Sequence, residues 1–177
     1  MTFSFTILPA PAPIKALTIG VTRDGLALVG FGAEPRAAHR AAARLGLHLV
    51  EDGATDEAAG QLTEYFAGAR QAFDIPLDWS LTSVGPQRRV LAALYETVGY
   101  GATVTYGELA ARSGIGSAYT AARGVGSIMG SNPIPVVVPC HRVLAADGLG
   151  GFGGGRATKE WLLALEGVLT PALDFGL

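Results

Sequence analysis

The chain of 177 residues is long enough for one large domain or two small ones, and about half of its residues are hydrophobic. This composition excludes a disordered chain; the single cysteine excludes an internal disulfide, and three scattered histidines exclude a zinc site built on Cys and His. The net charge of −2 argues mildly against a nucleic-acid partner.

Residues 1–80 are expected to form a small α/β domain. Prolines oppose a helix near the N-terminus, and a turn at residues 23–25 separates two apolar runs that fit a hairpin. The expected elements are strands within residues 1–31, a helix over 36–45, a strand over 47–50 and a helix from 56 to about 68. Thr55 is expected to cap that second helix. No catalytic pattern lies in this half.

Residues 81–177 are expected to form a second, mostly helical domain after an extended connection. The expected helices cover residues 86–98, 106–112, 118–129 and 159–166. Two of them, capped by Thr105 and Ser117 and joined by a glycine-containing turn, are typical of a helix-turn-helix. Many helical hairpins only pack against the rest of the protein. The pattern therefore leaves two interpretations open, a DNA-binding motif and a purely structural hairpin.

Cys140 follows an apolar, β-branched run at 136–138 that predicts a buried strand ended by Pro139. His141 comes next, and its imidazole could accept the thiol proton directly or through water. Glu166 could turn inward and partner His141, and Thr158 is expected to cap the last helix. The alternatives are an inert core cysteine and a solvated glutamate.

A glycine-dense loop spans residues 147–155, and no Gly-Lys-Ser/Thr follows it, which excludes a P-loop. Between Arg112 and Lys159 five basic residues stand against one acidic residue, so a DNA-binding face would lie there. Together these segments resemble the O6-alkylguanine-DNA alkyltransferase family. The motifs that carry the resemblance are Thr-Val-Thr-Tyr-Gly-Glu-Leu-Ala at 103–110, Ala-Ala-Arg-Gly-Val-Gly at 121–126, Asn-Pro at 132–133, Pro-Cys-His-Arg-Val at 139–143 and Lys-Glu-Trp-Leu-Leu-Ala-Leu-Glu-Gly at 159–167.

The resemblance covers about residues 62–167 and implies an α+β fold, with an RNase H-like N-terminal domain before the helical domain. It implies that Cys140 accepts an alkyl group irreversibly from O6 of guanine, once per molecule, with O4 of thymine as a second candidate site. The other implied catalytic residues are His141 as base, Glu166 as its orienting carboxylate, Asn132 at the cysteine loop, and Tyr106 and Lys159 at the leaving guanine.

The resemblance also implies double-stranded DNA as the partner, contacted in the minor groove by the helix-turn-helix, with the damaged base flipped out. Arg123 would fill the space in the base stack. The further expected DNA contacts are Ser117, Thr120, Ala121, Ala122, Gly124 and Arg142. The expected pocket residues are Val143, Phe152, Gly153, Gly154 and Gly155.

Departures from the family pattern occur at residues 83–87, 90–91 and 98–99, which concern packing and helix ends. Three consecutive glycines at 153–155 predict a roomy pocket that accepts groups as large as benzyl. We expect no cofactor, a cytoplasmic location and a monomer that could bind DNA cooperatively. The alternatives are a non-catalytic lesion binder, a turnover Cys-His thiol hydrolase and a plain helix-turn-helix regulator.

Overall fold

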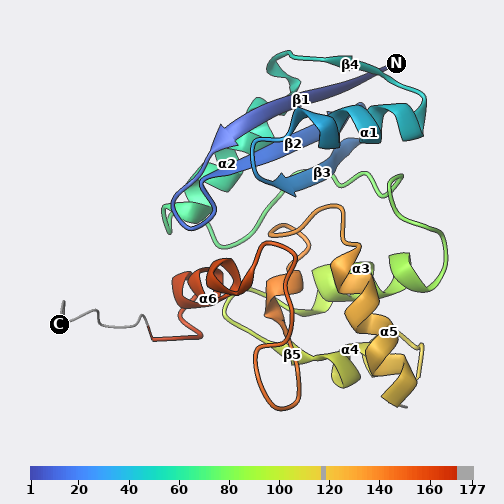
Figure 1. The fold of residues 1–177 in the computed structure, drawn as a ribbon, viewed down its shortest axis with the longest axis vertical. Coiled ribbons are helices and arrows are strands. Elements are labelled where there is room, and N and C mark those ends of the chain that lie inside the picture. Colours follow the sequence, from blue (N-terminus) through green and yellow to red (C-terminus); the bar gives the residue numbers. More distant parts are fainter. Residues whose placement is uncertain (117–118, 171–177) are drawn as a thin grey trace.

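Four strands within the first 50 residues form one sheet, seen at the top of Figure 1. The computed structural model describes residues 1–116 and 119–170. β1 (Thr2–Pro9), β2 (Ala16–Thr22) and β3 (Gly25–Phe31) form an antiparallel meander, and β4 (His48–Val50) pairs with β1 in parallel. The order is β3-β2-β1-β4.

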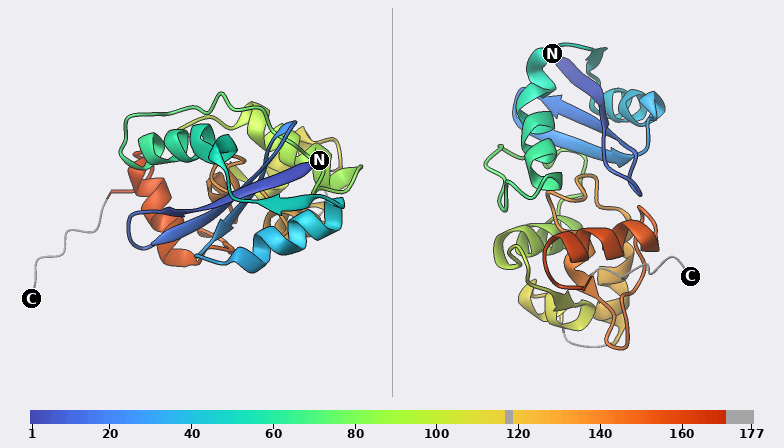
Figure 2. Two further views of the ribbon diagram at one scale, coloured as in Figure 1. Left: turned by 90° about the horizontal axis from the view of Figure 1, so that it is seen from above. Right: turned by 90° about the vertical axis from the view of Figure 1, so that its left-hand side faces the viewer.

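Two helices cover opposite faces of this sheet, as the right-hand view of Figure 2 shows. They are α1 (Pro35–Leu45) and α2 (Asp56–Phe66), and both lie where the sequence predicts helices. Pro35 starts α1 with its fixed φ, and Gly46 ends it in the left-handed conformation. Thr55 makes no capping hydrogen bond, so its expected role is wrong; the Asp52 side chain instead caps the 3₁₀ turn η1 (Gly53–Thr55) that leads into α2.

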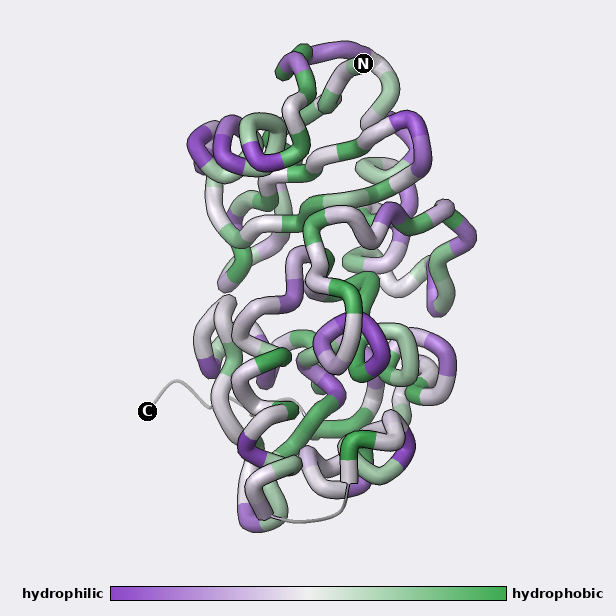
Figure 3. The backbone as a smooth tube through the Cα atoms, turned by 90° about the vertical axis from the view of Figure 1, so that its right-hand side faces the viewer, coloured by the Kyte–Doolittle hydropathy of each residue, from purple (hydrophilic) through white to green (hydrophobic). Residues whose placement is uncertain are grey.

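The two faces of the sheet belong to different cores. Phe3 and Phe5 pack under the alanine-rich face of α1, while Leu17 and Ile19 face α2 and join a core that continues into the C-terminal domain. Figure 3 shows this pattern, with hydrophobic stretches through the strands and between the domains and hydrophilic turns on the outer helix at upper left. Because this core is shared, packing of the N-terminal domain helps to stabilise the C-terminal domain.

In the described residues, the C-terminal domain contains four α-helices and a two-stranded parallel sheet. The helices are α3 (Pro86–Thr97), α4 (Tyr106–Arg112), α5 (Tyr119–Gly130) and α6 (Arg156–Leu165). Thr105 caps α4 as expected, because its hydroxyl accepts from the Glu108 amide at 3.2 Å. The expected cap of α5, Ser117, lies outside the described residues.

Two local expectations for this domain are wrong. Residues 136–138 form a tight turn rather than a strand: Val136 has φ 73°, and the Val138 amide donates to the Ile134 carbonyl at 2.8 Å. Thr158 is buried inside α6, and Gly155, at φ 90°, is the residue that precedes its first turn. A positive φ suits glycine there, since it has no Cβ.

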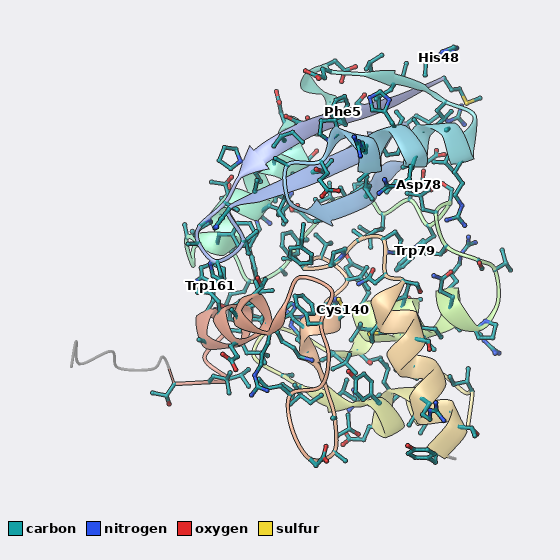
Figure 4. The ribbon with its side chains drawn as sticks, viewed as in Figure 1. Phe5, His48, Asp78, Trp79, Cys140 and Trp161 are labelled. Atoms are coloured by element: carbon teal, nitrogen blue, oxygen red, sulfur yellow. The ribbon has the colours of Figure 1, made fainter. Side chains whose placement is uncertain are left out.

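The two domains meet at several points around one side of the sheet. The Val29 amide, on the outer strand β3, donates to the Pro133 carbonyl at 2.8 Å. Phe66 of α2 packs against Trp161 of α6 with ring centroids 5.9 Å apart. Figure 4 shows Trp161 beside the N-terminal domain and Cys140 inside the C-terminal one. None of the helices in the described residues is both long and apolar enough to cross a membrane.

Candidate acceptor site

Cys140 begins the 3₁₀ turn η2 (Cys140–Arg142), directly after the loop at 131–139. Asn132 holds that loop from both sides: its side-chain nitrogen donates to the Val138 carbonyl at 2.9 Å, and its oxygen accepts from the Ile134 amide at 3.0 Å. These two bonds stabilise the turn around Val136. The position expected for Asn132, at the cysteine loop, is the one it occupies.

The Cys140 thiol is almost fully buried, and burial raises its pKa to about 11. The Asn132 side chain and the nearby Lys159 charge act in the opposite direction but do not outweigh burial. At neutral pH the resting group is therefore a thiol, and it needs a base before it can act as a nucleophile.

His141 and Glu166 form a buried pair next to that thiol. His141 Nε2 lies 2.8 Å from Glu166 Oε1, and neither side chain is exposed. Because the carboxylate accepts, Nε2 carries the hydrogen and Nδ1 is left as the acceptor. His141 Nδ1 is buried and has no hydrogen-bond partner in the described part of the chain. Burial lowers the pKa of His141, which keeps the ring neutral and able to take a proton.

Arg142 does not lie where the sequence analysis expected it. Its guanidinium is buried and holds Glu166 with Nε at 2.9 Å from Oε2 and Nη2 at 2.8 Å from Oε1. Its Nη1 donates to the Val98 carbonyl at 2.7 Å. A guanidinium used in this way is not free to contact DNA, so that expectation is wrong. Its location depends on a carboxylate 24 residues further along the chain.

Glu166 therefore accepts hydrogen bonds from several groups at once. His141 and Arg142 together lower the pKa of Glu166 to about 2, against the opposing effect of burial. Tyr65, from α2 of the N-terminal domain, also donates to Oε1 at 2.6 Å. The carboxylate is therefore charged at neutral pH.

Tyr106 and Lys159 lie on two further sides of the cysteine. β5 (Val104–Thr105) pairs with β6 (Val143–Leu144), so Tyr106 enters α4 beside the turn that holds Cys140. Lys159 is fully buried, and its ammonium donates to the carbonyls of Val143 at 2.7 Å and Gly151 at 3.3 Å. Burial raises the pKa of Tyr106, so its hydroxyl keeps its proton. Burial lowers the pKa of Lys159.

A cavity of about 180 Å³ opens above Cys140. Its lining consists of Tyr106, Gly126, Met129, Gly130, Cys140, Gly151, Phe152 and Gly153. Phe152 and Gly153 were expected there; Val143, Gly154 and Gly155 were expected but are not among its lining residues. Val143 is buried below and offers its carbonyl to Lys159, while Gly154 packs between two phenylalanines. Glycines from α5 and Gly151 supply the open space instead.

A larger groove runs beside this cavity along α5. Its lining includes Tyr119, Ala122 and Arg123 on the helix-turn-helix, and Ala145 to Asp147 where the glycine-dense loop begins. Tyr106, Gly126 and Gly151 line both the groove and the cavity, so the two adjoin. Arg123 and Thr120 are exposed, and Ala121, Ala122 and Gly124 are partly so. Ser117 lies outside the described residues.

Several residues of the site were missed in the sequence. Tyr65 was not predicted as a site residue, yet a buried tyrosine hydroxyl normally needs a hydrogen-bond partner, and that rule could have identified it. Tyr119 is highly exposed, and its ring faces the Arg123 guanidinium at 6.0 Å. Gly126, Met129, Gly130 and Gly151 carried no pattern that distinguishes a cavity wall from helix or loop packing.

Two family models match the chain. One is described as the ribonuclease-like domain of 6-O-methylguanine DNA methyltransferase and matches residues 10–79; the other is the DNA-binding domain of the same family and matches residues 85–168. The chain belongs to the 6-O-methylguanine DNA methyltransferase family. The expected α+β fold is thereby confirmed, whereas the boundary at residue 80 stays a prediction.

Curated relatives within the family agree with this. The methylated-DNA–protein-cysteine methyltransferase of Mycolicibacterium paratuberculosis is 52% identical over 116 residues, covering 65% of this chain and 67% of the relative. The protein of that name from Mycobacterium tuberculosis is 47% identical over 127 residues, covering 71% and 73%.

Solved structures of the family have the same arrangement. The O6-methylguanine methyltransferase of M. tuberculosis aligns with a TM-score of 0.75 at 37% identity, over 97% of this chain and 96% of that one. The structure of M. tuberculosis OGT in complex with DNA aligns with a TM-score of 0.74 at 36% identity, over 94% and 92%.

Proposed function

We propose that this protein repairs DNA directly, by moving an alkyl group from O6 of guanine to the sulfur of Cys140. The observation that carries the proposal is that the Cys140 cavity adjoins the groove beside the helix-turn-helix. A base extruded from DNA bound along α5 would enter the cavity and meet the thiol. Such extrusion is required because O6 is not accessible to a side chain inside the duplex.

The chemical step begins with the Cys140 proton. His141 Nδ1 accepts that proton, directly or through water, and Glu166 stabilises the imidazolium that forms. The sulfur then attacks the alkyl carbon in line, the carbon–sulfur bond forms, and the carbon–O6 bond breaks with its electron pair on guanine. The product is a thioether, which does not hydrolyse, so each molecule acts once.

The leaving guanine takes up negative charge in a largely dry cavity and needs a donor. Tyr106 lines the cavity and keeps its proton, so it can donate to the base as charge develops. Lys159 contributes a buried positive charge nearby and ties the Val143 and Gly151 carbonyls together. Guanine takes up one proton as it is restored, and the thiol gives up one proton to His141, so protons balance overall once His141 returns to its neutral form.

On the DNA side, we assign Arg123 to the space vacated by the flipped base, because it is exposed on the groove-lining face of α5. The small residues Ala122 and Gly126 would let this helix approach the minor groove closely. Little sequence information is readable there, which suits a protein that must repair any site. We also propose a cytoplasmic location, in which a free thiol stays reduced.

A duplex that carries one O6-methylguanine tests the proposal. After incubation, we expect mass spectrometry to find one methyl group on the peptide that contains Cys140 and unmodified guanine in the DNA. Cys140→Ala should bind the duplex and leave the lesion unchanged. Multiple turnovers without an adduct on the protein would instead establish a thiol hydrolase, and repair by the Cys140→Ala variant would overturn the proposal.

We propose further that the cavity accepts groups larger than methyl, with benzyl as the test case. The glycines at 126, 130, 151 and 153 leave its wall without side chains on several sides. Free O6-benzylguanine should therefore label Cys140. Labelling by methylated DNA but not by the benzyl compound would show that the cavity is too small.

A further inference from the structure

We propose that Tyr65 of the N-terminal domain is a positioning residue of the acceptor site, which acts through Glu166 on the proton affinity of His141. The inference rests on the proposed role of His141 as the base. It assigns to the N-terminal domain a part in the chemistry of a thiol that lies in the other domain.

The geometry of the contact is direct. The Tyr65 hydroxyl donates to Glu166 Oε1 at 2.6 Å, and this oxygen is the one that His141 Nε2 contacts at 2.8 Å. Tyr65 has no exposed surface, and its ring lies against Phe66, Phe73 and Tyr100. Packing of the ring on three sides therefore holds the hydroxyl on the carboxylate.

The consequence for His141 follows from charge. A second donor on Glu166 Oε1 takes up part of the negative charge of the carboxylate, so less of that charge stabilises the imidazolium form of His141. The Tyr65 hydroxyl therefore lowers the pKa of His141. Arg142 acts in the same direction on the same carboxylate. The hydroxyl itself remains a donor, because burial and the adjacent Glu166 raise the pKa of Tyr65 far above its ordinary value.

Other charged and titratable groups also affect the pKa of His141, so a test must leave their positions and charges unchanged. The charged and titratable groups around it are Glu166, Arg142, Lys159, Cys140, Tyr65 and Tyr100. Tyr100 provides a matched control, because its hydroxyl donates to the Leu165 backbone carbonyl at 3.0 Å and not to the carboxylate. Tyr100→Phe thus removes a similar hydroxyl from the same cluster without touching Glu166.

The test is a titration of His141 by NMR in Tyr65→Phe, Tyr100→Phe and the unmodified protein, together with the pH profile of labelling by O6-benzylguanine. In Tyr65→Phe we expect the pKa of His141 to rise by about half a unit to one unit, the size of one net hydrogen bond. The acidic limb of the labelling profile should move to higher pH by the same amount. Tyr100→Phe should change neither.

An unchanged His141 titration in Tyr65→Phe would overturn the proposal, even if labelling became slower, because a purely structural role predicts slower labelling without a shift. The titration does not require alkyl transfer. If the unmodified protein were never labelled at Cys140, the proposed function would fail while the role of Tyr65 could still be decided.

Discussion

The ring of Phe31, at the end of β3, meets the ring of Phe152 edge-on with centroids 5.4 Å apart. Phe152 lines the Cys140 cavity, so the N-terminal domain supports the wall of the site. Gly154 lies against both rings: a Cβ there would come within 2.9 Å of each. The conformation of the loop that carries Phe152 therefore depends on Phe31, which lies 121 positions before Phe152 in the chain.

We expect Gly154→Ala to destabilise the protein by about 1–3 kcal/mol, the usual cost of overpacking, because both rings must move. Gly153→Ala is the matched control, since a Cβ at that position meets no atom within 4 Å. Urea unfolding of the two variants measures the difference. Equal stability of the two would show that the phenylalanine pair does not constrain the loop.

The rate of labelling by O6-benzylguanine should rise with pH through the pKa of His141, which lies below its ordinary value because the ring is buried. Above that limb the rate should stay flat, because burial holds the pKa of Cys140 at about 11 and the imidazole does the work of removing the proton. Rapid-quench labelling across roughly pH 5 to 9 measures the profile. A tenfold rise per pH unit above neutrality would mean that hydroxide, and not His141, removes the proton.

Arg142→Gln should destabilise the protein by about 3–5 kcal/mol, because it leaves a buried carboxylate without its cation. Arg156→Gln is the control: its ion pair with Glu160 is largely exposed and should be worth less than about 1 kcal/mol. Thermal unfolding distinguishes the two. A small effect of Arg142→Gln would indicate that His141 and Tyr65 suffice to hold Glu166.

The same ion pair predicts how stability depends on pH. The pKa of Glu166 is lowered in the folded state to about 2, so its contribution is fully present above the pKa of an unfolded glutamate, about 4.3, and is lost as pH falls toward 2. In Arg142→Gln the folded pKa rises and this contribution shrinks. Unfolding free energies compared between about pH 7 and pH 3 should therefore decrease less steeply in the variant.

Arg123→Ala should slow repair of a methylated duplex by about tenfold or more, since an unfilled base stack costs a few kcal/mol. Labelling by free O6-benzylguanine should not change, because Arg123 lines the outer groove and not the cysteine cavity. Both substrates are assayed with the same variant, so labelling by free O6-benzylguanine serves as the control for repair of the duplex. Equal losses with both substrates would show that the substitution disturbs the cavity itself.

Elements bounded by local stop and start residues could be predicted from the sequence. Pro35 and Gly46 bound α1, and the Thr105 cap and the glycine after Ser113 bound α4, because each acts on backbone within one turn of itself. The pairing of His141 with a glutamate was also accessible, since a helix-end carboxylate beside an apolar residue suggests a buried partner.

What could not be predicted depends on contacts between distant parts of the chain. Three consecutive valines favour a strand locally, but the Asn132 bonds and the Val29 contact with Pro133 hold residues 136–138 in a turn. The charge of Arg142 suggested a DNA contact, because nothing local in the sequence pairs it with Glu166, 24 residues further along the chain. Tyr65 lies 101 residues from Glu166, and no local pattern links the two.

The free edge of β3 is occupied over part of its length by the protein's own chain. The Leu26 amide donates to the Pro76 carbonyl, the Asp78 amide donates to the Leu26 carbonyl, and the Val29 amide donates to the Pro133 carbonyl. An unpaired outer strand can template the addition of a strand from another molecule, a common route to aggregation. At the opposite edge β4 has three residues, too few to recruit a long partner. The contacts that seat the sheet on the C-terminal domain thus also protect it from edge-to-edge association between copies.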